Sequence, residues 1–156
     1  MKKHGMIAGW CFLLALSPVA AQETGAPPLA EAESPAGLVG LRLEELYATF
    51  GVPQKVYAVR GQEPWQDDVV FVYQGVDCYI FEEHVWLVSV PAAYGVNVGD
   101  TRTRIQETLG ERGGTVYEFP DSLLFKLPSA SWEMMMRVNF DEAGKAKAVF
   151  IYRSDM

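Results

Sequence analysis

Cysteine, histidine and positive charge are all scarce in this sequence. The 156 residues include 2 cysteines and 2 histidines, and 13 lysines and arginines stand against 20 aspartates and glutamates, for a formal net charge of −7. This negative balance argues against nucleic acids and anionic membrane surfaces as partners.

Sequence motifs of the common catalytic and cofactor sites are also missing. The chain has no Gly-x-Ser-x-Gly elbow, no His-Glu-x-x-His zinc motif, no phosphate-cradling glycine loop and no dinucleotide fingerprint. We therefore expect no enzymatic activity, no catalytic residues, no cofactor and no metal.

The N-terminus has the pattern of an export signal over residues 1–21. Lys2 and Lys3 precede an apolar run from residue 7 to 16, and small residues end the segment at Ala21. The apolar run is about ten residues long, too short for a membrane span of about 20. We expect cleavage after Ala21, a periplasmic or secreted protein, and no integral membrane span after cleavage. An uncleaved membrane anchor is the alternative.

Cleavage would leave 135 residues, and the loss of Lys2 and Lys3 would leave 11 basic against 20 acidic residues, a net charge of −9. Cys78 would then be the last cysteine, so no internal disulfide can form. Whether Cys78 is free or pairs between chains stays open. Residues 22–36 are rich in Pro, Ala, Glu and Gly without apolar periodicity, which predicts a flexible linker.

Beyond the linker, one pattern occurs twice, 59 residues apart. Its matching positions are Val39-Gly40 and Val98-Gly99, Leu46 and Ile105, and Phe50-Gly51 and Leu109-Gly110. Such an internal echo indicates a structural repeat. It predicts an α+β fold of two tandem repeats, residues 37–93 and 94–156, each a short helix followed by an antiparallel meander of three to four strands.

Apolar periodicity places the elements within each half. Helical spacing joins Leu43, Leu46, Tyr47 and Phe50 in the first half, and Thr101, Ile105, Thr108 and Leu109 in the second. Strands are expected over residues 55–60, 69–73, 78–81 and 85–90, and over 114–119, 123–127, 131–140 and 146–152. In the strand 131–140, alternation directs Trp132, Met134, Met136, Val138 and Phe140 to the core and Met135 to solvent.

The strand 69–73 is apolar on both faces, since Val70 and Val72 fill the face opposite to Val69, Phe71 and Tyr73. Cover from within the protein is the favoured interpretation, and a partner on the second face is the alternative. Trp65 lies in a polar loop, and alternation directs Trp86 away from Val85 and Leu87. The candidate partner-binding residues are Trp65, Val70, Val72 and Trp86.

His84 follows Glu82 and Glu83, and an acid–histidine group can bind a metal or act as a general base. These residues fall in a predicted turn, where solvated charge is ordinary, so a hydrolase site is the less favoured interpretation. Cys78 falls in an apolar strand, where a thiol is expected to be buried.

The segment from Gly40 to Pro53 resembles the small envelope modules of the SmpA/OmlA (BamE) type, in which a short helix ends on an aliphatic residue, Gly, any residue and Pro. Two such units in tandem are similar in layout to the β-lactamase inhibitory protein. Arg42 departs from the capping Ser/Thr of the pattern, and Glu111-Arg112 departs from its proline. The resemblance implies a periplasmic module that works by binding other proteins.

The function expected from the sequence is an exported, non-catalytic protein-binding or cell-envelope accessory module, with another envelope protein as its partner. One alternative is a periplasmic carrier of a small apolar ligand or lipid. Another is an inhibitor of a secreted enzyme, by analogy of shape. The sequence identifies neither the partner nor the oligomeric state.

Overall fold

The computed structural model describes residues 35–61, 67–128 and 132–155. The predicted signal 1–21, most of the predicted linker and Trp65 lie outside these residues. Within the described ranges, no helix has the length and apolar character needed to cross a membrane.

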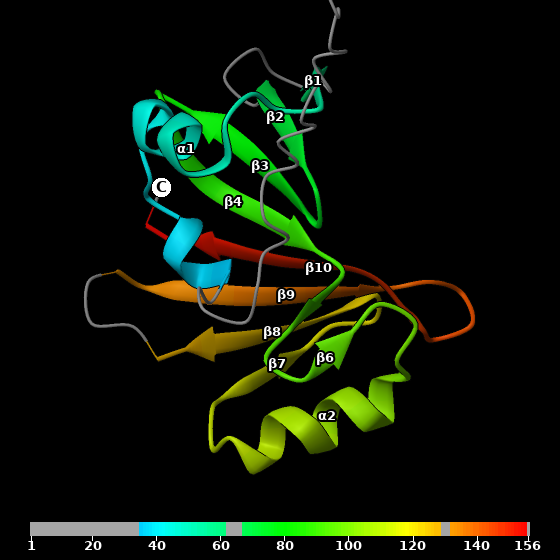
Figure 1. The fold of residues 1–156 in the computed structure, drawn as a ribbon. Helices are drawn as coiled ribbons and strands as arrows, with labels where there is room; N and C mark the ends of the chain where they lie inside the picture. The colour runs from blue at the N-terminus through cyan, green and yellow to red at the C-terminus, as the bar shows by residue number, and fades with distance from the viewer. Residues whose placement is uncertain (1–34, 62–66, 129–131, 156) are drawn as a thin grey trace, which may run out of the picture.

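One antiparallel sheet of eight strands forms the body of the molecule, in the order β1-β2-β3-β4-β10-β9-β8-β7 (Figure 1). The strands are β1 (Lys55–Val59), β2 (Asp68–Tyr73), β3 (Val76–Phe81), β4 (His84–Val90), β7 (Val116–Glu118), β8 (Ser122–Leu127), β9 (Met134–Phe140) and β10 (Ala146–Arg153). A separate short ribbon pairs β5 (Ala92–Ala93) with β6 (Val96–Asn97).

Two α-helices accompany the sheet, α1 (Leu43–Phe50) and α2 (Arg102–Glu111), with a 3-10 turn η1 (Pro35–Leu38) before α1. Both α-helices occur where the apolar spacing predicts them. Thr101 caps α2 by accepting a hydrogen bond from the Arg104 amide. At α1, which lacks a Ser or Thr cap, the Arg42 amide donates to the Glu45 carboxylate at 2.8 Å.

The predicted α+β fold of two tandem helix-plus-meander repeats is wrong, because the structure is mainly β, with a single continuous sheet. Strand β4 pairs directly with β10, placing Val88 opposite Ile151 and Leu87 opposite Tyr152. A meander with a free edge leaves a row of unpaired amides and carbonyls, and pairing two such edges satisfies them. Periodicity within a strand does not show which edges meet, so the sequence pattern missed this junction.

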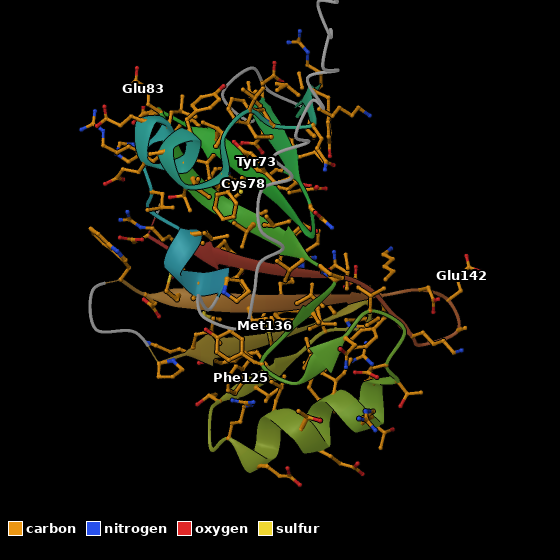
Figure 2. The ribbon with its side chains drawn as sticks, in the orientation of Figure 1. Tyr73, Cys78, Glu83, Phe125, Met136 and Glu142 are labelled. Carbon is orange, nitrogen blue, oxygen red and sulfur yellow. The ribbon has the colours of Figure 1, made fainter. Side chains whose placement is uncertain are left out.

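The helices cover one face of the sheet, which we call the covered face (Figure 1). Leu46 and Phe50 of α1, and Ile105 and Leu109 of α2, belong to the same hydrophobic core as the sheet residues. Sheet members of this core labelled in Figure 2 are Tyr73, Cys78, Phe125 and Met136. We call the opposite face the open face, since neither α-helix packs on it.

Strand β9 follows the predicted alternation in part. Four residues predicted to face the core are buried: Met134, Met136, Val138 and Phe140. Trp132 is 47% exposed, contrary to the prediction, because it precedes the start of β9, and the Arg153 guanidinium lies 3.8 Å from the centre of its ring. Met135 is buried although it points to the open face, so the prediction that it meets solvent is also wrong.

We predict that Ile151→Ala destabilises the whole sheet by about 2–5 kcal/mol, the usual cost of truncating a fully buried aliphatic side chain. Ile151 is fully buried on β10 opposite Val88 of β4. Urea unfolding should therefore show one transition that shifts equally for amide resonances in β3 and in β8.

As a control, Val52→Ala should change the free energy of unfolding by less than about 0.5 kcal/mol, because surface substitutions away from special features have small effects. Val52 is 85% exposed. Two separate transitions, with Ile151→Ala moving only that of β8, would contradict a single cooperative sheet.

Candidate functional site on the open face of the sheet

A row of large apolar side chains crosses the open face from strand to strand. Successive cross-strand partners in this row, which we call the aromatic row, are Tyr57, Val70, Tyr79, Leu87, Tyr152 and Met135. Directly opposed residues in antiparallel strands have Cβ atoms about 4.5–5.5 Å apart and contact each other. The row is therefore a continuous apolar strip that runs through β1, β2, β3, β4, β10 and β9.

Two of the predicted partner-binding residues lie on β2 of this face. Val70 is fully buried between its cross-strand partners Tyr57 and Tyr79, so an approaching molecule meets the two rings first. Val72 is half-buried in the neighbouring row. The second face of β2 thus receives most of its cover from side chains of the adjacent strands.

A β-bulge turns Trp86 and Leu87 to the open face together. Ile80 pairs with Val85 and Tyr79 pairs with Leu87, which leaves Trp86 as the extra residue of β4. The simple alternation predicted Leu87 on the side opposite to Trp86, and the bulge removes that difference. Trp86 was correctly directed away from the buried Val85.

The surface is hollowed where the aromatic row crosses β4, β10 and β9. A hollow of about 380 Å³ is lined by Trp86, Leu87, Arg137, Asn139, Phe150 and Tyr152. The Phe150 ring makes an edge-on contact with Tyr79, with ring centres 6.5 Å apart. Trp86, Leu87, Phe150 and Tyr152 are each half-buried, so part of every ring or chain remains available for contact.

Hydrogen bonds fix two of the lining side chains. The Trp86 indole N–H donates to the Asp68 carboxylate at 2.9 Å, across the intervening β3, and this bond joins Trp86 to β2. Arg137 donates from Nε to Oδ1 of Asn139 at 2.7 Å. Both partners lie on the same face, so the indole and the guanidinium are held in place by the site itself.

Burial raises the pKa of two phenols and one carboxyl group on this face. Burial raises the pKa of Tyr79 to about 12 and also raises the pKa of Tyr152, against which the nearby Arg137 charge acts. Burial likewise raises the pKa of Asp68, and the Trp86 hydrogen bond opposes that rise. The phenols are neutral at physiological pH and offer hydroxyl groups rather than charge.

The other candidate chemistry lies elsewhere. His84 Nδ1 lies 2.8 Å from the Glu82 carbonyl, and Glu82 and Glu83 occupy an exposed turn, where Figure 2 labels Glu83. Cys78 is fully buried on the covered face, and burial raises its pKa to about 12. The described part of the chain holds no group of three or more His, Cys, Asp or Glu side chains arranged to bind a metal ion.

Sequence comparisons give no relative: no family model matches the chain, and no curated protein matches it. Solved structures do resemble it. One is an extracellular protein containing an SCP domain from Bacillus anthracis Ames, at 12% identity and a TM-score of 0.50 over 80% of this chain and 47% of that one. Another is a cysteine-rich secretory protein from Staphylococcus aureus Mu50, at 15% identity and a TM-score of 0.49 over 80% of this chain and 48% of that one.

The chain therefore spans about half the length of these two proteins, and at such low identity the Bacillus anthracis structure indicates a shared fold alone. The Bacillus anthracis protein is neither a BamE-type module nor a β-lactamase inhibitory protein, so the resemblance inferred from residues 40–53 is wrong. A short helix that ends at a glycine before a proline is a local pattern compatible with many folds.

We predict that the protein loses stability above about pH 9, because the buried Cys78 and Tyr73 and the half-buried Tyr79 hold their protons more tightly when folded than when unfolded. Their pKa values rise to about 12 in the folded protein, from 9.0 for the thiol and from 10.0 for the two phenols. At pH 7 these groups are protonated in both states and add no pH dependence. Above about pH 9 the unfolded state ionises first, and the free energy of unfolding falls.

Urea unfolding midpoints at about pH 7 and pH 10.5 measure this effect, and Cys78→Ala should reduce the difference between them by removing one of the three groups. The variant also lowers stability at neutral pH by truncating a buried side chain, so the comparison is between slopes. Equal midpoints at the two pH values for the wild-type protein would contradict the prediction.

Proposed function

We propose that this protein is an exported, non-catalytic module that binds another protein through the open face of its sheet. The observation that carries the proposal is the aromatic row with its hollow, on a face where neither α-helix packs. Contiguous apolar surface with a polar rim marks interaction sites in proteins, and aromatic residues and arginine are enriched there.

Export is supported by the N-terminal pattern of residues 1–21, with its two lysines, short apolar run and small residues before position 22. The similar Bacillus anthracis protein is described as extracellular, which agrees with this proposal. An exported module meets other exported or envelope proteins, and we propose a partner of that class.

The absence of catalysis is part of the proposal and rests on the chemistry of the available groups. The buried Cys78 thiol, with its raised pKa, is a poor nucleophile. His84 is the first residue of β4, its ring lies beside the Glu82 carbonyl, and it is not among the residues that line the hollow. The phenols of the open face are neutral and serve as contact surface.

A carrier of a small apolar ligand fits the structure less well. Ligand pockets usually bury about 70–90% of the ligand surface. The hollow here lies on the outer side of one sheet, lined by residues of β4, β9 and β10 alone. The space between the sheet and the helices, where a carrier would hold its ligand, is filled by core side chains such as Leu46, Ile105 and Met136.

We predict that a photo-crosslinking amino acid at Leu87 captures one specific partner in the cell that makes this protein, and that the same group at Val52 does not. Leu87 lies in the aromatic row, and Val52, 85% exposed, follows α1. The captured protein, identified by mass spectrometry and purified, should bind the wild-type protein in solution.

In that purified pair, Leu87→Asp should weaken binding by at least about tenfold, since a central contact is replaced by an unpaired charge. Val52→Asp, the matched control with the same added charge, should bind like the wild-type protein. Equal capture at both positions, or equal binding by the two variants, would show that the open face is not the binding surface.

A further inference from the structure

Arg137 places a cation in an otherwise largely apolar hollow. The Nε–H group donates a hydrogen bond to Asn139, and Arg137 is exposed and lies opposite Phe150 in the strand register. Among the residues that the structure describes, no carboxylate lies within ion-pair distance of Arg137.

Two other cations of the open face, Lys126 and Lys55, have partners. Lys126, next to Met135 in the register, donates to Glu133 at 2.9 Å. Lys55 lies over the Tyr57 ring, 5.1 Å from its centre, and its charge lowers the pKa of Asp77 against the raising effect of burial. Arg137 thus differs from both in having its charge unmatched within the described part of the chain.

The donors that point into the hollow are side chains. Strands β4, β10 and β9 are interior strands of the sheet, each paired on both sides, so their amides are used in the ladder. Capture of a chain terminus commonly relies on a nest of free backbone amides. A side-chain carboxylate, by contrast, matches the fork of a guanidinium in two parallel hydrogen bonds.

The net charge of the chain narrows the kind of acidic partner that fits. At −7 the protein repels a broadly acidic surface. Charge beyond about 8 Å is largely screened at physiological ionic strength. The complementary surface is therefore one carboxylate among apolar groups, which pairs with Arg137 while its neighbours contact the rings.

We propose that the hollow recognises an Asp or Glu side chain of a partner protein that lies beside an aromatic or branched aliphatic residue. The carboxylate pairs with Arg137, and the apolar neighbour packs against Trp86 and Phe150. The volume, about 380 Å³, lies at the lower end of the range of about 300–1,000 Å³ for binding pockets and suits one or two side chains. This inference rests on the proposed function and adds the chemistry of the partner.

A library of random dodecapeptides displayed on phage, selected on the purified mature protein, tests the proposal. Enriched peptides should carry Asp or Glu next to an aromatic or aliphatic residue. A synthetic peptide from the selection should lose about tenfold in affinity when its acid is changed to the amide, the scale expected for a charge-assisted pair at a contact centre.

The Arg137→Gln variant should bind the acidic peptide about tenfold more weakly than the wild-type protein does. It should bind the acidic and the amide peptide equally well, because the change in the protein and the change in the peptide remove the same interaction. Arg137→Lys keeps the positive charge but lacks the two parallel donors of the guanidinium, so its affinity for the acidic peptide should lie between those of the wild-type protein and Arg137→Gln. Arg137 is exposed, and circular dichroism and urea unfolding confirm that each variant is folded.

The inference would be overturned if the acid-to-amide change in the peptide lowered its affinity for Arg137→Gln as much as for the wild-type protein. It would also be overturned if the selected peptides carried no acidic residue. Failure to enrich any peptide would overturn it too. The proposed function is tested separately by crosslinking at Leu87. If a protein captured there binds equally well to Arg137→Gln and to the wild-type protein, that result supports protein binding by the open face and contradicts the proposed carboxylate contact.

Discussion

The pairing of β4 with β10 is the interaction on which the rest of this structure depends. It joins two groups of four strands into one sheet and makes both central strands interior, so their amides are satisfied and their side chains stand on two distinct faces. The covered face holds the core with α1 and α2. The open face acquires its hollow at this junction, because Leu87 of β4 meets Tyr152 of β10 there.

On the open face, which no α-helix covers, some apolar side chains are buried by their larger neighbours and others stay partly exposed. Val70 and Met135 are buried beside larger neighbours, whereas Trp86, Leu87, Phe150 and Tyr152 keep part of their surface in contact with solvent. The Trp86–Asp68 and Arg137–Asn139 hydrogen bonds hold the polar ends of this surface in one arrangement. A pre-arranged surface loses less conformational freedom when a partner binds, which is the physical reason for placing the function here.

The sequence predicted local structure better than architecture. Helical spacing gave α1 and α2, alternation gave the main strands, and Trp86 was directed to the correct side of β4. The fold class was wrong because the joining of β4 and β10 is a long-range contact without a local signal. Leu87 was misplaced because a bulge adds one residue and reverses alternation, and Trp132 because it precedes the strand it was assigned to. Arg137 and Phe150 were not among the candidate site residues, since their proximity exists only across paired strands.

The central claim is that the open face is a binding surface rather than bare sheet. Hydroxyl-radical footprinting of Trp86, Phe150 and Tyr152, in the purified protein and in intact cells that produce it, measures this directly. The account predicts that oxidation of these rings falls severalfold in the cellular setting while oxidation of the exposed Trp132 is unchanged. Equal oxidation of Trp86, Phe150 and Tyr152 in both settings would contradict it.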